Sequence, residues 1–298
     1  MSTDIQPAEK AAWHQWRGQG IGASDAPVVA GLSRYKSRYQ LWLEKTGQGS
    51  QRPPNEAMKW GLRLEDVIAE AYRERTGTIT HSAQVQRTHP NYEWMRCTLD
   101  GLTAENRVVE LKAAGLGTAR GLGEDGDSDS LPNEWILQVQ HQLAVTGLEW
   151  ADVAVFMPQL ELRIYPVRRD DDLIGSLIDT ESEFWGQVCN RVEPEPETLE
   201  DLEDWHRRVK PKGTRVAIEN DEIMTTAHYY KISGDNVKKW EQERDDAKYE
   251  LIRALAGNEF GDLPDGRVIR LQSIEVAERD QHVKAHTQLR LTIKEPKE

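Results

Sequence analysis

Two carboxylates and a lysine lie close together in the middle of the sequence, at Asp100, Glu110 and Lys112. The residues before Asp100 and around Glu110 predict two strands joined by a turn near 104–106. In a strand, Glu110 and Lys112 project to the same face, and antiparallel pairing brings Asp100 beside Glu110. A hard divalent cation relieves the repulsion between two such carboxylates. With Lys112 to hold an attacking water or stabilise a charged transition state, the pattern indicates metal-assisted phosphodiester hydrolysis.

Taken alone, an acid near a Glu-x-Lys sequence also fits a strand edge that carries charge for solubility. The length and composition of the chain exclude several classes of protein. The chain has 298 residues, 38% hydrophobic and 30% charged, a mixture too varied for a coiled coil or a low-complexity tail. Its longest apolar runs span only a few residues, and we expect no membrane segment and no secretion signal. Because neither a membrane segment nor a secretion signal is expected, we predict a cytoplasmic protein of a bacterium or a phage-infected host. Two cysteines cannot hold an iron–sulfur cluster.

The net charge of −13 is unevenly distributed along the chain. Residues 1–60 carry 8 Lys and Arg against 5 Asp and Glu, whereas residues 61–190 carry 11 against 22. A basic start beside an acid-rich middle suits a metal-dependent enzyme that acts on a polyanion. It suits a protein that merely coats DNA less well, because such proteins depend on an extended positive surface.

The order of predicted elements indicates an α/β fold. A helix is expected over 58–75, strands over 78–88, 94–99 and 107–111, a mobile loop over 116–132, and a helix over 133–146. Two strands at 151–157 and 160–167 and a helix over 171–192 follow. This order predicts a mixed sheet flanked by helices, in one domain over residues 1–192.

Residues 193–298 are expected to form a C-terminal extension. The stretch after residue 193 has the composition of a charged connector, and a long helix is predicted over Asn236–Ala256. We expect the apolar face of that helix to pack on the first domain or on a partner helix. Strands at 268–276 and 289–293 are expected to pair as a hairpin.

Five short blocks, in order, resemble the YqaJ-like viral recombinase nucleases, which include the phage lambda-type exonucleases of the PD-(D/E)xK superfamily. The resemblance covers roughly residues 13–167. The blocks are RGQGIGASD from Arg17, GLSRYK from Gly31 with LWLEKTG from Leu41, KWGLRLE from Lys59, LDG from Leu99 with ELK from Glu110, and QVQHQL from Gln138. The resemblance implies a PD-(D/E)xK, restriction-endonuclease-like core.

Specific roles follow from the resemblance. It implies that Asp100, Glu110 and the main-chain carbonyl of Leu111 bind the metal directly, and that Glu65 completes the site, in some cases through water. It implies that Lys112 is the catalytic lysine and that Gln138 positions the nucleophile or the phosphate. Arg17 and Ser24 match the pair that binds a terminal 5′-phosphate.

The sequence departs from the family pattern at two places. Leu99 stands where the superfamily name has proline, and Ala113-Ala114 replaces the usual residues after the lysine; the second change affects the path of the following loop. Three residues also have structural alternatives. Glu65 has the alternative of a surface acid, Ser24 that of a helix N-cap, and Gln142 is interpreted as a packing or surface residue. The basic loop with Arg34, Lys36 and Arg38 is either a DNA contact or a solvated loop.

The resemblance implies a Mg²⁺-dependent 5′-to-3′ exonuclease that acts on ends of linear double-stranded DNA, with Mn²⁺ able to substitute and one or two ions bound. It implies phage-type recombination with a single-strand annealing protein, and a homo-oligomer, since some relatives form trimeric rings. The motif fixes the metal chemistry but not the DNA structure that is bound. A structure-specific or general endonuclease is therefore the alternative. An idle DNA-binding module is disfavoured because Glu65, Asp100, Glu110 and Lys112 are all present.

Overall fold

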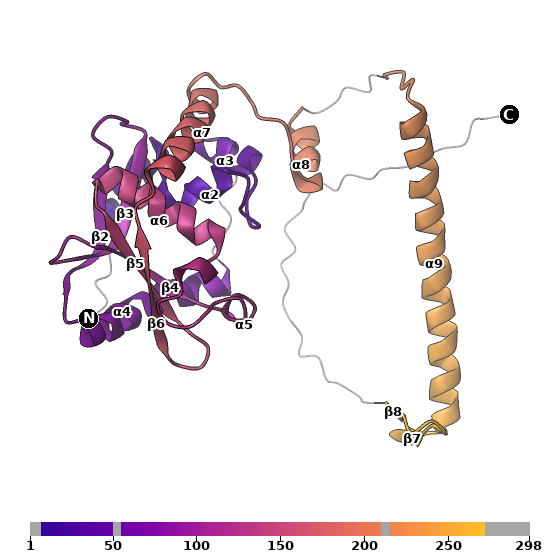
Figure 1. Ribbon diagram of the computed structural model, residues 1–298. Coiled ribbons are helices and arrows are strands. Elements are labelled where there is room, and N and C mark those ends of the chain that lie inside the picture. The colour runs from indigo at the N-terminus through magenta and orange to yellow at the C-terminus, as the bar shows by residue number, and fades with distance from the viewer. Residues whose placement is uncertain (1–6, 50–54, 210–214, 272–298) are drawn as a thin grey trace. The chain divides into compact units, whose positions relative to one another are not determined.

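The computed structural model describes residues 7–49, 55–209 and 215–271, and the chain divides into two units between Trp205 and His206 (Figure 1). The division falls within a helix, α8, beyond the boundary at 192 that the sequence suggests. Asp201 explains why the start of this helix belongs to the first unit. Its buried carboxylate accepts a 2.9 Å hydrogen bond from the hydroxyl of Ser37 and also accepts from the backbone N–H groups of Glu197 and Thr198.

The helices that lie wholly in the first unit are α1 (Pro7–Gly18), α2 (Ala26–Val29), α3 (Arg38–Lys45), α4 (Glu56–Thr76), α5 (Leu116–Ala119), α6 (Asn133–Thr146) and α7 (Asp171–Cys189), and the first unit also contains the start of α8 (Leu199–Val209). Short 3-10 turns lie at Ala23–Asp25 and Ser128–Ser130. The strands are β1 (Ile21–Gly22), β2 (Ile79–Thr88), β3 (Met95–Thr103), β4 (Val108–Ala113), β5 (Trp150–Phe156) and β6 (Leu162–Arg168).

These strands form one mixed sheet in the order β1-β3-β4-β5-β6, with β2 paired along β3. The pairs β3–β4 and β5–β6 are antiparallel, and β4–β5 is parallel. Because parallel neighbours need a crossover, the chain leaves β4, passes through α5 and α6 and returns as β5. The mixed sheet that the sequence predicts is confirmed.

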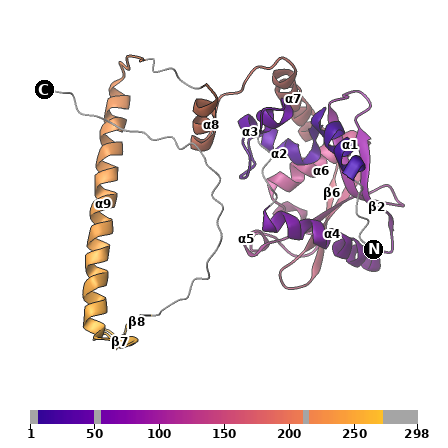
Figure 2. The ribbon, with the colours of Figure 1, turned by 180° about the vertical axis from the view of Figure 1, so that it is seen from behind.

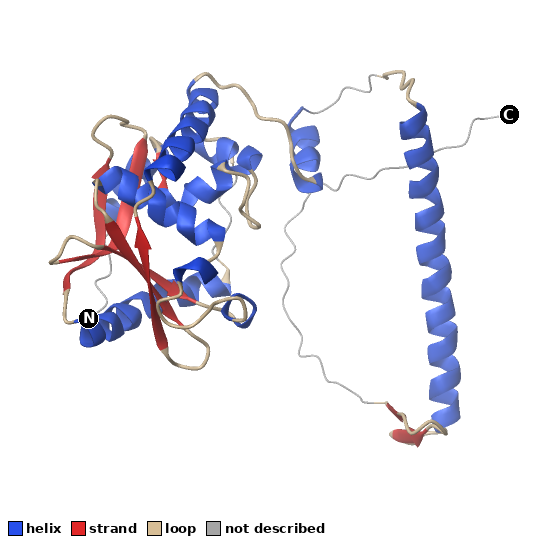
Figure 3. Ribbon diagram, in the orientation of Figure 1, coloured by secondary structure: helices blue, strands red, loops and turns tan. Residues whose placement is uncertain are grey.

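Helices cover both faces of the sheet, as Figures 2 and 3 show. On one face, α6 and α7 pack against side chains of β3, β4 and β5, among them Leu99, Val108 and Val153. On the other face, α4 packs Ile68 and Tyr72 against Val109 and its neighbours. Strand β4 is therefore buried on both sides over its first four residues, and its side chains point alternately toward α6 and α4.

Three local expectations are corrected by the structure. The segment 116–132, expected as a loop, contains α5 and a 3-10 turn. The expected connector after residue 193 contains α8, which is strongly amphipathic. Its many charged residues make the segment resemble a connector in the sequence. The long helix begins much earlier than Asn236, because the side chain of Asn220 caps it by accepting from the backbone N–H groups of Glu222 and Ile223.

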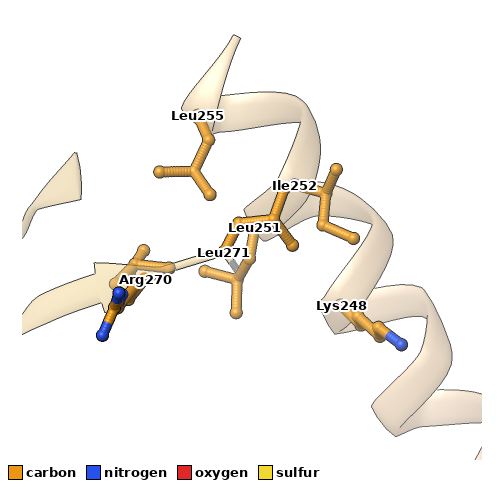
Figure 4. A pocket seen from close by; sticks show the side chains of 7 residues that line it. Lys248, Leu251, Ile252, Leu255, Arg270 and Leu271 are labelled. Carbon is orange, nitrogen blue, oxygen red and sulfur yellow. The ribbon is translucent and has the colours of Figure 1, made fainter. Parts of the chain in front are cut away.

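The second unit consists of α9 (Asp221–Leu255) followed by a short hairpin of β7 (Phe260–Asp262) and β8 (Val268–Arg270). The strand predicted at 289–293 lies outside the described residues, and β8 pairs with β7. Figure 4 shows the hollow between the end of α9 and β8, which has a volume of about 190 Å³; its labelled lining residues are Lys248, Leu251, Ile252, Leu255, Arg270 and Leu271. Within the described residues, no helix combines the length and hydrophobicity that crossing a bilayer requires.

Candidate active site

The candidate site forms where β3 and β4 separate. Their pairing comprises Gly101 opposite Val109 and Leu102 opposite Val108, after which β4 continues alongside β5. The carboxylate of Asp100 then accepts the backbone N–H of Leu111 at 2.9 Å through Oδ2. The separation thus leaves Asp100 and Glu110 side by side, as the strand spacing predicts.

Glu110 is buried, at 3% exposure, and three side chains donate to its carboxylate. Its Oε1 accepts 2.6 Å hydrogen bonds from the Nε2 of Gln138 and from the Nζ of Lys112, and its Oε2 accepts one from Gln142. A carboxylate offers about four lone-pair positions. Glu110 therefore keeps capacity for one further partner on Oε2.

Lys112 lies on the same face of β4 as Glu110 and also donates to the Oε1 of Gln138 at 3.0 Å. Its ammonium lies 5.9 Å from the centre of the Trp135 ring. Burial alone would lower the pKa of Lys112, but the adjacent Glu110 carboxylate outweighs it and raises the pKa above its ordinary value. The lysine is therefore a fixed positive charge in this site.

The acids of the site repel one another. Burial first, and then the charge of Glu110, raise the pKa of Asp100 well above its usual value. The same two causes raise the pKa of Glu65, which α4 brings toward the site from the opposite face of the sheet. Tyr72, two turns further along α4, fixes that helix by donating from its hydroxyl to Asp152 of β5 at 2.6 Å.

These groups fit a hard divalent cation in their chemistry. Asp100 and Glu110 supply oxygen donors with unused lone pairs, and their mutual repulsion is what a cation would remove. Among the described residues, no three side chains of His, Cys, Asp or Glu converge as a metal-binding group on their own. A site built on Asp100 and Glu110 therefore needs donors of another kind, such as a main-chain carbonyl or water.

Gln142 corrects the sequence interpretation, which assigned it to packing or the surface. It is fully buried and donates from Nε2 to Glu110. Gln138 and Gln142 are four residues apart, and that spacing places both on one side of α6. The four-residue spacing of Gln138 and Gln142 was therefore the feature of the sequence that could have predicted that both reach Glu110. Gln140 points elsewhere, since it donates to the carbonyl of Arg168 and accepts from the N–H of Asp170.

Arg17 and Ser24, predicted to act together, lie in contact. The Nη2 of Arg17 donates to the hydroxyl oxygen of Ser24 at 2.7 Å, and Ser24 is exposed. The predicted alternative, an N-cap, is not the interaction observed, because the N-cap position of α2 is Asp25. Behind them lies a buried ion pair that sequence reasoning missed: Lys45 contacts Asp25 at 2.7 Å, and both side chains are at most 2% exposed.

This ion pair holds Arg17 in place. Arg17 lies 3.5 Å from Asp25, and its main-chain carbonyl accepts from the Nζ of Lys45. Burial opposes ionisation of Asp25, but Lys45 and Arg17 outweigh it, so its pKa lies below the ordinary range. Two cations thus face one carboxylate, which leaves a net positive charge next to the exposed Ser24 hydroxyl.

The three basic residues predicted as DNA contacts lie in separate environments. Arg34 is 87% exposed and 3.9 Å from Glu134, and Lys36 is paired with Glu44 at 2.6 Å. Arg38 lies over the ring of Phe184, 5.9 Å from its centre. The structure therefore does not gather these three cations into one site.

Comparison with known proteins finds a family whose model matches the part of the chain that carries the candidate site. Residues 12–149 match the model of the family described as the YqaJ-like viral recombinase domain. The uncharacterized protein YqaJ of Bacillus subtilis is 34% identical to the chain over 177 residues, which is 58% of this chain and 54% of the relative. The chain spans about half the length of this curated relative.

Solved structures share the fold of the first unit. An alkaline exonuclease, LHK-Exo, from Laribacter hongkongensis superposes with a TM-score of 0.52 at 24% identity, over 67% of this chain and 99% of that chain. LHK-Exo in complex with dAMP gives 0.52 at 23% identity, over 67% of this chain and 98% of the other. The first unit therefore has the fold of this alkaline exonuclease. The family match contains Asp100, Glu110, Lys112 and Gln138.

Proposed function

We propose that the protein is a Mg²⁺-dependent deoxyribonuclease that digests linear double-stranded DNA from the 5′ end. The arrangement around Glu110 carries this proposal: two carboxylates, one fixed lysine charge and one glutamine meet where two strands separate. A structural role alone would not require a buried carboxylate to be adjacent to a second one whose pKa its charge raises.

Each residue has a task in this chemistry. Asp100 and Glu110 hold the cation, with the Leu111 carbonyl as a further ligand and Glu65 acting through water. Bound Mg²⁺ would supply positive charge at the phosphate and a water of lowered pKa. Lys112 keeps its proton and donates toward the attacking oxygen or the phosphoryl oxygens, where negative charge develops. Gln138 fixes the positions of Glu110 and Lys112, because its Nε2 donates to Glu110 and its Oε1 accepts from Lys112.

The proposed 5′ polarity rests on the Arg17–Ser24 pair. Arg17 is one-third exposed, Ser24 is exposed, and the two cations Arg17 and Lys45 face the single carboxylate of Asp25. A guanidinium beside a hydroxyl suits the oxygens of a terminal phosphate. Such a phosphate exists only at a DNA end, so this pair of side chains favours end-dependent digestion over internal cleavage.

The remaining expectations belong to the same proposal. Mn²⁺ substitutes for Mg²⁺, the enzyme assembles as a homo-oligomer in the cytoplasm, and it works with a single-strand annealing protein. The YqaJ-like viral recombinase match supports a role in phage-type recombination. Residues 193–298 are proposed to be separate from the chemistry, because the candidate site is built from residues of the first unit.

One experiment tests activity and polarity together. The protein is incubated with Mg²⁺ and three substrates: linear duplex with 5′-phosphates, the same duplex with 5′-hydroxyls, and a covalently closed circle. We expect digestion that is fastest on the phosphorylated linear DNA and absent on the circle. Asp100→Asn, which keeps an oxygen to accept the Leu111 N–H, is the inactive control. Cleavage of the circle would replace the exonuclease proposal with the endonuclease alternative.

A further inference from the structure

The side-chain amide of Gln142 is oriented so that its nitrogen donates to Glu110 while its oxygen has no partner in the described residues. Gln142 is 0% exposed and its Nε2 donates to the Oε2 of Glu110 at 2.6 Å. Its own Oε1 is buried and has no hydrogen-bond partner within the described part of the chain. Buried acceptors are usually satisfied, so an unsatisfied one beside a candidate catalytic acid calls for an explanation.

The opposite orientation of the amide is excluded by electrostatics. Rotating the amide by half a turn would place its oxygen against the Glu110 carboxylate, where two acceptors would repel each other. The amide therefore satisfies Glu110 with its donor and leaves its acceptor unpaired.

This bond determines how Glu110 can present its oxygens. Gln138 and Lys112 both bind Oε1, so without Gln142 all donors would lie on one oxygen. The carboxylate could then turn and offer both oxygens to Lys112. With Gln142 on Oε2, both oxygens are anchored, the carboxylate plane is fixed, and the remaining lone pair lies on Oε2.

We propose that Gln142 is a positioning residue that fixes the Glu110 carboxylate in the orientation that binds the divalent cation. This inference rests on the proposed metal-dependent function and adds a residue to it. Partners that orient a metal ligand commonly change metal affinity or activity by about 10–100-fold when they are removed.

Gln140 provides a matched control on the same helix. It is also buried, at 2% exposure, and it makes two hydrogen bonds, but these go to the backbone of Arg168 and Asp170, away from Glu110. Gln142→Met and Gln140→Met both replace a buried amide with an apolar chain of similar length. Only the first removes a donor from Glu110.

Mg²⁺ binding to the full-length wild type and both variants is measured by calorimetry without DNA, alongside melting temperature. We expect the dissociation constant for Mg²⁺ to rise about tenfold or more in Gln142→Met and to stay within twofold in Gln140→Met, although the control loses more thermal stability. Equal affinity in Gln142→Met and wild type, or an equal loss in both variants, would overturn the positioning role.

A measurement on the wild type keeps the test decisive if Gln142→Met does not fold. In a nitrogen–proton NMR spectrum, the side-chain amide of Gln142 should shift when Mg²⁺ is added, whereas that of Gln140 should not. An unmoved Gln142 resonance contradicts the inference. Failure of the proposed function has a different signature, since the wild type would then bind Mg²⁺ with its Gln142 resonance shifting but cut no DNA.

Discussion

The ammonium of Lys112 lies 2.6 Å from Oε1 of Glu110, two residues earlier on the same strand. The period of a β-strand places both side chains on one face, and burial makes their attraction strong enough to keep the lysine protonated. The protein thus carries its own cation beside a pair of carboxylates. Removing that cation should change both the chemistry and the response to metal.

Lys112→Met should abolish hydrolysis while leaving DNA binding in place. The variant keeps the apolar stem but removes the charge that faces the reacting phosphate, and loss of one such donor lowers turnover by about 100-fold or more. Single-turnover rates at saturating Mg²⁺ and binding in Ca²⁺ separate the two effects. A variant that cuts DNA at the wild-type rate contradicts the assigned role of Lys112.

The same variant should respond more strongly to Mg²⁺. Lys112 is the cation that acts on the Asp100 carboxylate within the described residues. Without it the metal-free protein is destabilised by the repulsion between Glu110 and Asp100, and added Mg²⁺ relieves more of that repulsion. We expect a larger Mg²⁺-induced rise in melting temperature than in the wild type. An equal rise in both proteins would show that Mg²⁺ binds away from Glu110 and Asp100.

Asp25→Asn should destabilise the first unit strongly. Lys45 is 1% exposed and Asp25 is the carboxylate that it contacts, so the variant leaves a buried ammonium without a counter-ion. Breaking a buried pair in this way costs about 3 kcal/mol or more in the free energy of unfolding. Urea unfolding at neutral pH measures the change, and Asp265→Asn, at an exposed pair in the second unit, is the control and should change little.

The sequence predicts the parts of the site that depend on short-range spacing and leaves out those that depend on packing. Strand periodicity places Glu110 and Lys112 on one face, and the turn after β3 brings Asp100 beside them. The partnership between His141 and Glu181 joins residues 40 positions apart on two helices. Its existence depends on how α6 and α7 pack, and nothing in the local pattern of either helix encodes that contact.

This buried pair should make stability depend on pH. Both nitrogens of His141 face acceptors: Nδ1 lies 2.8 Å from Glu181 and Nε2 lies 2.9 Å from the carbonyl of Arg96. Burial alone lowers the pKa of His141, but Glu181, the Arg96 carbonyl and the charge of Asp25 raise it above 6.5. His89 also lies near enough for the two histidines to repel each other.

Because the folded-state pKa is raised, the stabilisation is fully present below pH 6.5 and is lost as the pH rises through the folded-state value. Glu181→Gln should remove this dependence, since the glutamine amide can donate to Nδ1 of a neutral His141. Because the pKa of His141 lies above 6.5, we expect the free energy of unfolding to fall more steeply in the wild type than in the variant as the pH rises above that value. Parallel curves would show that the pair does not titrate.

Arg17→Ala tests the proposed recognition of the 5′-phosphate separately from the metal chemistry. Arg17 bonds Ser24 at 2.7 Å and lies against the buried Asp25, so its guanidinium is already oriented before DNA binds. The variant should slow digestion of 5′-phosphorylated duplex about 100-fold, the size of a charge-assisted contact of about 3 kcal/mol, and should barely change the rate on a 5′-hydroxyl duplex that never made the contact. The two rates should therefore converge. Arg253→Ala, which removes an exposed arginine of α9, is the matched control. Equal losses on both substrates in Arg17→Ala would show that Arg17 supports the fold around Asp25 and does not recognise the DNA end.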